Sequence, residues 1–306
     1  MNEESVQLES QEAAEQEAGK GEHVRTFVGY VKTVLITLVV ALVLKTFVIE
    51  AFRIPSSSME ETLLVGDFLL VNKLAYGIRT PRFIPLTDIA VSTYYVPAFK
   101  NVKRGEIVVF EFPGSYNRSD DEEPVNYIKR CIGLPGDVVQ IIEGQVYING
   151  SPVGLPRYAV QNGSNGAASH YRSRLFPWGF GFTEQRYGPL VVPKKGDRID
   201  LTEENLSLWR SLIIREGHAV RFEGKDLILI DGELAAHYTV EQNYYFVMGD
   251  NRDNSLDSRY WGFVPEENLI GEALVVYWSW DPDVPVSNVW DKLVSIRWGR
   301  IGTMIR

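Results

Sequence analysis

The apolar positions of this chain form one long run near the N-terminus. From Val28 to Ile49 the sequence is apolar apart from Lys32 and Lys45. The uncharged part, 33–44, is shorter than the roughly 20 residues that cross a bilayer core of about 30 Å, but both lysines lie near the ends, where their stems can extend toward the headgroups. A buried core helix or a cleavable export signal fits less well, because the run lacks an amphipathic period, a basic n-region and a small-x-small site. We therefore expect one transmembrane anchor over residues 26–49.

After Arg53 the pattern changes to short runs rich in Val, Ile and aromatic residues. Such runs, closed by Gly, Pro and Asn-Gly turns, predict strands and hairpins, and they read GDFLLVNKLAYG, EIVVFEFP and VVQIIEGQVYING. A later segment, HAVRFEGKDLILIDGEL, has the same turn layout, which indicates either a weak internal duplication or two hairpins with similar turn chemistry. Most of the chain after the anchor is therefore predicted to be antiparallel sheet, with surface loops near residues 117–124 and 161–181.

One segment has a helical pattern instead, Thr202 to Glu216. Thr202 is suited to cap its N-terminus, and Gly217 follows its end. The apolar stripe of this predicted helix consists of Leu206, Trp209 and Ile213.

Composition excludes several classes of function. A formal net charge of −9 without a basic stripe argues against a nucleic-acid partner. The single cysteine, Cys131, cannot form an intrachain disulfide or a CxxC site, and the four histidines lack metal-binding spacing. We therefore expect no metal and no cofactor. Residues 1–25 form an acidic, solvated tail to which the sequence assigns no role.

Three consecutive serines in the stretch IPSSSMEETL, starting at Ile54, are candidates for a nucleophile. A serine hydroxyl needs a base within hydrogen-bond reach, yet no histidine lies in a triad motif and no GxSxG elbow is present. Lys129, in the strand-like segment YIKRCIGLPGD, is the alternative base. Its pKa would have to fall by roughly 2 units from about 10.4, which burial alone can achieve. On the residues alone, an ordinary edge lysine and a serine-rich turn remain open.

A third stretch, GDNRDNSLDSRYWGFVP from Gly249 to Pro265, is crowded with polar residues between two apolar segments. Such density predicts a buried hydrogen-bond network. A calcium loop fits poorly, because Arg252 stands at the third ligand position and no glycine stands at the sixth.

Taken in order, the anchor and four boxes resemble bacterial type I signal peptidase (leader peptidase), a membrane-anchored Ser-Lys protease that removes signal peptides. The resemblance runs from about residue 30 to RWGRIG near the C-terminus and is weaker over residues 150–240. The four boxes read IPSSSMEETLLVGDFLLVNK, RGEIVVFEFP, YIKRCIGLPGD and FVMGDNRDNSLDSRYWGFVP.

The resemblance implies a role for each matching residue. Ser58 is then the nucleophile and Lys129 its general base, while Ser56 assists the oxyanion hole and Ser255 orients the lysine. Asp257 and Arg259 would form a salt bridge that braces the site. Shallow pockets for small residues before the cleaved bond, of the Ala-x-Ala type, would be lined by Phe52, Ile54, Met59, Val109 and Ile128. In two places the chain departs from the family pattern: Ser57 replaces a usual glycine and Glu61 a common proline.

The resemblance also implies a fold and a location. The fold would be mainly β, with antiparallel sheets of the type I signal peptidase/LexA-like kind, a catalytic core over 50–137 and 246–306, and an inserted β subdomain over 138–245. The protein would be a monomer that spans the bacterial cytoplasmic membrane once, with its catalytic domain on the outer or periplasmic side, although charge bias around the anchor leaves orientation open. Its partners would be signal peptides and membrane lipid, which exposed residues such as Trp290 and Trp298 would contact.

Two other classes of protein fit the sequence less well. A LexA-like self-cleaving repressor protease needs a DNA-binding module and an internal cleavage bond, and the anchor takes the place of both. A membrane-tethered binding protein without catalysis would have no reason to keep Ser58, Lys129 and Ser255 together.

Overall fold

The N-terminal unit of the molecule contains one long helix, Phe27–Phe47. The structure is a computed structural model that describes residues 27–79, 95–96, 100–114, 125–157, 159–161, 175–223 and 227–305. The 21-residue helix has a mean hydropathy of 2.4 and is long and apolar enough to cross a membrane. The hydroxyls of Thr33 and Thr37 donate to carbonyl groups one turn back, so these two polar groups are satisfied within the helix. The predicted helix is thus confirmed, two residues shorter at its C-terminal end than the predicted anchor.

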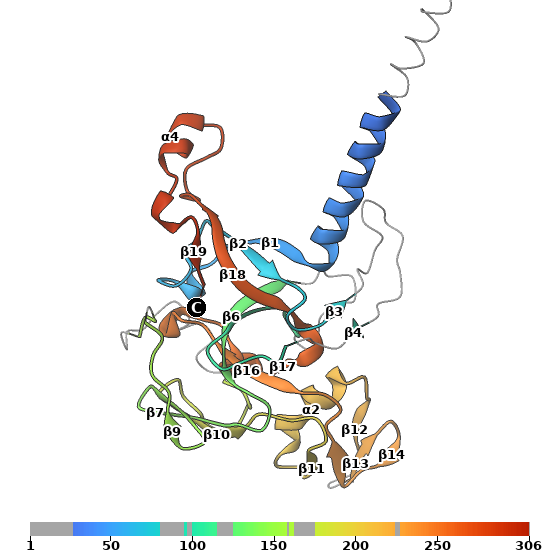
Figure 1. The fold of residues 1–306 in the computed structure, drawn as a ribbon. Helices are drawn as coiled ribbons and strands as arrows, with labels where there is room; N and C mark the ends of the chain where they lie inside the picture. The colour runs from blue at the N-terminus through green and yellow to red at the C-terminus, as the bar shows by residue number, and fades with distance from the viewer. Residues whose placement is uncertain are drawn as a thin grey trace, which may run out of the picture. The chain divides into compact units, whose positions relative to one another are not determined.

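The second unit, residues 49–80 and 92–306, is built on one large antiparallel sheet (Figure 1). Its strand order is β1-β2-β18-β5-β6-β16-β17, with β19 beside β18. The strands of this sheet are β1 Ile49–Arg53, β2 Asp67–Asn72, β5 Ile107–Glu111, β6 Asn126–Gly133, β16 Tyr244–Met248, β17 Val264–Pro265, β18 Leu269–Ser279 and β19 Thr303–Met304. The chain therefore leaves the sheet after β6 and re-enters it beside β6 at β16.

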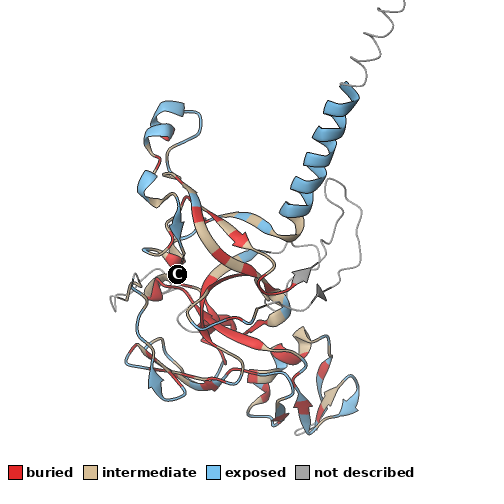
Figure 2. Ribbon diagram, viewed as in Figure 1, coloured by how far each residue is buried: buried red, intermediate tan, exposed pale blue. Residues whose placement is uncertain are grey.

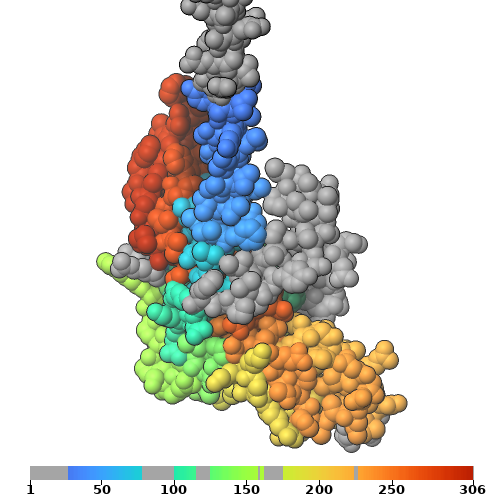
Figure 3. Space-filling model, turned by 45° about the vertical axis from the view of Figure 1, so that its right-hand side comes forward, coloured from blue at the N-terminus to red at the C-terminus, as the bar shows by residue number. Residues whose placement is uncertain are grey.

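Between β6 and β16 the chain forms smaller sheets. A four-stranded sheet has the order β10-β7-β8-β9, a three-stranded meander the order β12-β13-β14, and β11 pairs with β15. Figure 3 shows these as two neighbouring lobes, one with the green β7–β9 and one with the yellow and orange residues from α2 to β14. The strands are β7 Val138–Ile142, β8 Gln145–Ile148, β9 Ser151–Pro152, β10 Arg186–Val191, β11 Arg198–Asp200, β12 Val220–Glu223, β13 Leu227–Ile230, β14 Glu233–Leu234 and β15 His237–Thr239. Outside these sheets β3 Ile78–Arg79 pairs with β4 Tyr95–Val96. The mainly antiparallel β fold is confirmed.

The predicted helix begins later than expected. It is α2, Leu206–Arg215. Thr202 and Asn205 bond to each other, because each side-chain oxygen accepts the backbone N–H of the other, and this closed turn precedes the helix. Thr202 caps the start of the helix as predicted, because its Oγ1 accepts the Asn205 N–H and its carbonyl accepts the Leu206 N–H. Gly217, with φ of 96°, follows the end of the helix as expected. The other helical segments are α3 Ser258–Trp261, α4 Val289–Val294 and the 3-10 turns Ser57–Met59, Arg252–Asn254, Glu266–Asn268 and Trp298–Arg300.

Buried apolar residues of the large sheet belong to two cores, and Figure 2 shows much of this sheet in the colour of buried residues. Successive residues of a strand point to opposite faces. On β5, Val108 and Phe110 join the larger core, and Ile107 joins a smaller one. The smaller core contains Ile54 and Met59, which flank the serine run, so packing on this face fixes where the serines lie.

Candidate active site

Ser58 lies on a tight 3-10 turn that follows β1. The turn is closed by the Glu60 N–H, which donates to the Ser57 carbonyl at 2.9 Å, and Met59 beside it is completely buried. A buried methionine acts as an anchor, because moving it would expose apolar surface. The hydroxyl of Ser58 is thereby presented from a fixed, half-buried position.

Lys129 brings its amine to this hydroxyl from β6. Its Nζ lies 2.7 Å from Ser58 Oγ and donates to the Ile128 carbonyl at 2.9 Å. On the sheet, Lys129 pairs with Val108 of β5, so the backbone that carries the amine is held by a central strand. The structure thus joins the two residues that the sequence proposed as nucleophile and base, 71 positions apart.

The surroundings of Lys129 favour its neutral form. The side chain is only 4% exposed, and this burial lowers its pKa to about 8, against the opposing charges of Asp257 and Asp250. Desolvation penalises the charged form of a buried amine. At pH 7 a pKa of about 8 leaves roughly a tenth of the amine uncharged, against about one part in 3,000 at the ordinary pKa, and this neutral form has a lone pair that can accept a proton.

The two other predicted serines lie close to Ser58 but differ in their contacts. Ser56 Oγ lies 3.4 Å from Ser58 Oγ and is exposed, as a group that meets the substrate should be. Ser255 is buried, and its hydroxyl lies beside the Asp257 carboxylate, where it helps to hold the pKa of that carboxyl below its ordinary value, but it makes no well-formed hydrogen bond among the described residues. The Lys129 amine bonds to Ser58 and to the Ile128 carbonyl, and no bond joins it to Ser255.

Asp257 and Arg259 form a buried ion pair below the site. Arg259 donates from Nε and Nη2 to the two carboxylate oxygens of Asp257 at 2.8 and 2.9 Å. Burial alone would raise the pKa of Asp257, but the adjacent guanidinium and the Gly249 N–H hold that pKa below its ordinary value. Arg259 also donates to the Arg252 carbonyl at 2.8 Å, which ties the ion pair to the backbone of the polar stretch.

Ser57 fits its turn without strain. It is absent from the described residues with positive φ, so the glycine usual in the family is not required for backbone reasons here. Its hydroxyl accepts a hydrogen bond from the Asn254 amide at 3.0 Å. The side chain of Ser57 thus adds a tie between the serine turn and the polar stretch.

Glu61, in contrast, adopts a left-handed backbone with φ of 71°. Proline, the residue common in the family at this position, is locked near φ −65° and cannot adopt this conformation. The turn after Ser58 therefore has a different backbone from one that contains proline.

Replacing Glu61 tests this turn. Glu61→Gly is expected to raise the free energy of unfolding by about 0.5–1 kcal/mol, because glycine adopts positive φ without a Cβ clash. Glu61→Pro is expected to lower it by about 2 kcal/mol or more and to slow cleavage, since the turn must rearrange. Thermal unfolding and preprotein cleavage measure both effects. A Glu61→Pro protein that matched the wild type in both assays would show that the turn is not left-handed.

The predicted pocket residues surround the serine turn but are mostly covered. Ile54, Met59 and Val109 are buried to 2% exposure or less, while Phe52 and Ile128 keep part of their surface exposed. Val109 and Ile128 are direct partners across β5 and β6, and Ile128 packs on the cluster that contains Ile54 and Met59. The covered residues form a firm floor, and only Phe52 and Ile128 offer apolar surface to a ligand.

Sequence reasoning missed a second buried ion pair, Arg130 with Asp250. Arg130 donates to the two carboxylate oxygens of Asp250 at 2.8 and 2.6 Å, and Thr62 Oγ1 donates to the same carboxylate at 2.6 Å. The available signal was that Arg130 follows Lys129 directly and Asp250 lies in the polar stretch. This pair joins the lysine strand, the segment after Ser58 and the polar stretch, which confirms that the stretch holds a buried network.

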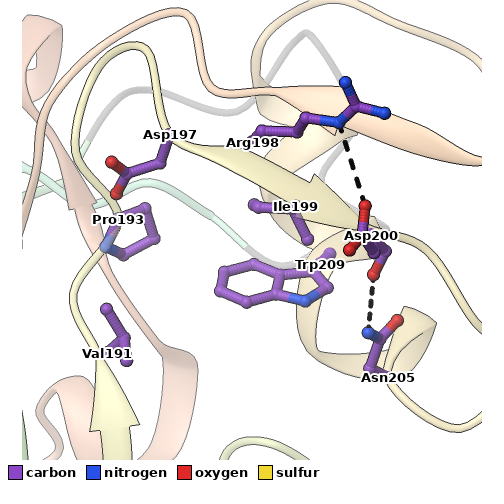
Figure 4. A pocket seen from close by; sticks show the side chains of 8 residues that line it. All are labelled: Val191, Pro193, Asp197, Arg198, Ile199, Asp200, Asn205 and Trp209. Atoms are coloured by element: carbon purple, nitrogen blue, oxygen red, sulfur yellow. Dashed lines mark hydrogen bonds and ion pairs between the residues drawn. The ribbon is translucent and has the colours of Figure 1, made fainter.

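A separate hollow of about 350 Å³ lies between α2 and the segment from Val191 to Asp200 (Figure 4). Its lining is half apolar, with the Trp209 ring under Ile199, and half polar, with Asp197 and Asp200 among the polar residues. Asp200 contacts Arg198 at 3.9 Å and accepts from the Asn205 amide through its backbone carbonyl. None of the predicted site residues lines this hollow, so it is distinct from the candidate active site.

Some predictions fall outside the described residues. These are the acidic tail, the loop at 117–124 and most of the loop at 161–181.

Comparison with known proteins gives one consistent result. The family model described as "Signal peptidase, peptidase S26" matches residues 27–278. Signal peptidase I of Pseudomonas aeruginosa is 34% identical over 277 residues, which cover 86% of this chain and 76% of the relative. Signal peptidase I of Pseudomonas fluorescens is also 34% identical, with coverage of 86% and 76%. That of Aquifex aeolicus is 33% identical over 251 residues, with coverage of 81% and 83%.

Proposed function

The chain belongs to the signal peptidase family, peptidase S26, and we propose that it cleaves preproteins through a dyad of Ser58 and Lys129. As a member of this family it is a membrane-anchored hydrolase that acts as a signal peptidase. The observation that supports the dyad is the 2.7 Å approach of a buried amine to the Ser58 hydroxyl. Among the described residues, no histidine or carboxylate lies within hydrogen-bond distance of the Ser58 hydroxyl. Lys129 is therefore the base that is available to it.

In the proposed mechanism neutral Lys129 takes the proton of Ser58 while Oγ attacks the scissile carbonyl carbon. The Ser58 N–H and the Ser56 hydroxyl donate to the oxyanion that forms. The Lys129 ammonium then gives its proton to the departing amine. Finally a water molecule, activated by the same lysine, hydrolyses the acyl-enzyme. Ser255 is retained as a proposed positioning residue, because its buried hydroxyl lies beside Asp257, whose charge acts on Lys129.

We further propose that the substrate has small residues before the cleaved bond, of the Ala-x-Ala type. A firm floor of Ile54 and Met59 leaves shallow apolar sites, and a larger side chain would overpack them. The peptide would bind extended, as a strand added to a sheet edge. N-terminal sequencing of the mature product checks this: cleavage after large residues at the same rate would exclude the shallow pockets.

Single serine substitutions test the dyad. Ser58→Ala is expected to reduce preprotein cleavage by at least about 10³-fold, because no oxygen remains to attack the carbonyl. Ser57→Ala is the matched control: it loses one hydrogen bond, worth about 1 kcal/mol, and is expected to keep most of the activity. The assay follows a preprotein with an Ala-x-Ala site and the full-length enzyme. Equal activity of the two variants would exclude Ser58 as the nucleophile.

We also propose that the segment around α4 lies in the membrane surface. Trp290, Val294 and Trp298 are 79%, 84% and 69% exposed, values far above those of core residues. Figure 2 shows α4 almost wholly in the colour of exposed residues. Exposed apolar residues grouped along one segment mark a contact surface, and tryptophan prefers the interface of a bilayer. The catalytic unit would then rest on the outer face of the cytoplasmic membrane. Protease added to intact spheroplasts tests this location, because the catalytic unit should be digested, and its protection would contradict the proposed side.

Quenching of tryptophan fluorescence by brominated lipid tests this contact. In vesicles that contain the full-length protein, the double variant Trp290→Phe, Trp298→Phe is expected to lose most of the quenched signal. Trp178→Phe is the control, because Trp178 is also exposed, at 54%, but lies outside the α4 segment. If the double variant is quenched as strongly as the wild type, the segment does not enter the interface.

A further inference from the structure

A short segment between β9 and β10, residues 159–161, lies against the polar stretch of the active site. The Val160 N–H donates to the Asp250 carbonyl at 3.0 Å, and the Arg252 N–H donates to the Val160 carbonyl at 2.9 Å. Val160 and Asn251 therefore form an isolated parallel bridge. Val160 thus holds the backbone of Asp250 and Arg252, the two neighbours of Asn251, although it lies about 90 positions earlier in the sequence.

Asn251 in turn holds the serine turn. Its N–H donates to the Ser58 carbonyl at 3.1 Å, and its side-chain amide donates to the Ser57 carbonyl at 3.2 Å. Gly249 lies so close that a Cβ there would collide with the Ser58 carbonyl oxygen. Because these segments are in direct contact, a shift of the Asn251 backbone would also displace Ser58.

The other end of the segment is anchored in the four-stranded sheet. Gln161 Nε2 donates to the Gly144 carbonyl at 2.9 Å, at the turn that joins β7 and β8. Gly144 has φ of 81°, and a Cβ on it would collide with the Gln161 amide. The Gly144 N–H donates to the Gln185 carbonyl, which ties the same turn to the segment before β10. The segment is thus held between a rigid turn on one side and the polar stretch on the other.

We infer that Ala159–Gln161 is a positioning segment for Ser58, through which the part of the chain between β6 and β16 sets the geometry of the nucleophile. The inference rests on the proposed role of Ser58. Attack on a carbonyl requires reacting atoms about 3–3.5 Å apart, and a displacement of about 1 Å can cost about 10²-fold in rate. A backbone bridge fixes the Asn251 main chain, and hence the Ser58 carbonyl, without touching the substrate or the lysine.

Val160→Pro tests the bridge, because proline lacks the N–H that donates to Asp250. The full-length variant is expected to show a kcat about tenfold or more below the wild type, with KM within about twofold and the pH limb of Lys129 unmoved. Val160→Ala keeps the N–H and is expected to match the wild type. Equal losses in the two variants, or a change confined to KM, would overturn the inference.

Gln161→Leu is a second test of the positioning segment, and it remains informative if Val160→Pro does not fold. It removes the anchor on Gly144 and is expected to lower kcat several-fold at an unchanged thermal midpoint. A wild-type kcat in this variant would refute a positioning role. Ser58→Ala is run in parallel: if it still cleaves, the proposed nucleophile has failed, whereas an inactive Ser58→Ala beside fully active Val160→Pro and Gln161→Leu rejects only the positioning segment.

Discussion

Replacing Lys129 by methionine is expected to abolish preprotein cleavage and to stabilise the folded protein in the same step. The loss of activity should reach at least about 10³-fold, because Ser58 then has no base. Methionine has similar length and no charge, so it fills the same buried site. Cleavage of an Ala-x-Ala preprotein and unfolding in denaturant measure the two effects on one preparation.

The gain in stability follows from the pKa of the lysine. It falls from 10.5 to about 8 on folding, so the unfolded chain binds more protons between those pH values and stability rises with pH across that window. Below pH 8 the folded protein carries nearly the full destabilisation from burying the charged amine of Lys129, about 3 kcal/mol at pH 7. The advantage of Lys129→Met should therefore be largest below pH 8 and vanish above about 10.5. Substantial cleavage by this variant, or a loss of stability at pH 7, would contradict the assignment of a buried neutral base.

Removing the carboxylate of Asp257 is expected to cost the fold about 3–5 kcal/mol. The Arg259 guanidinium, 3% exposed, would be left as a buried charge without its counterion. Asp257→Ala should therefore lower the unfolding midpoint sharply. In whatever protein remains folded, the pKa of Lys129 should fall further, because the charge of Asp257 raises it, and the acidic limb of kcat/KM should move to lower pH.

Asp231→Asn provides the control for this substitution, because asparagine tolerates the positive φ of this turn and removes the charge. Asp231 pairs with the basic side chain of His218 at 2.6 Å, but the Asp231 side chain is 52% exposed. Exposed pairs contribute about 0–1 kcal/mol, so the control should unfold close to the wild type with an unchanged pH profile. If the two variants lost equal stability, the buried pair would not brace the site as proposed.

Local patterns predicted much of the fold. The Asx-Gly turns were visible because both residues need positive φ, and Asn149 and Asp231 have it, as do Gly150 and Gly232 after them. The N-terminal cap of α2 was visible in Thr202, whose hydroxyl accepts the Asn205 N–H. The strand order could not be predicted from periodicity, since β18 lies between β2 and β5 through a pairing that only the folded chain creates.

The candidate site, too, could be predicted only in part from the sequence. An inward-facing Lys129 could be proposed from its strand-like neighbours, and the family resemblance supplied its partner. The ion pair of Arg130 with Asp250 and the bridge of Val160 with Asn251 could not be proposed, because each joins segments 120 and about 90 residues apart with no shared motif. The left-handed Glu61 was hidden for a different reason: glutamate rarely adopts positive φ, so its identity gave no signal.

Titration of Lys129 itself is the most direct test of the account. In full-length protein with ¹³C-labelled lysine side chains, the ε-carbon signal that is missing from the Lys129→Met variant belongs to Lys129. Its chemical shift should titrate with a midpoint near pH 8, below the ordinary value of 10.5. A midpoint at the ordinary value would mean that the amine is charged at neutral pH, and Lys129 could not be the base that deprotonates Ser58.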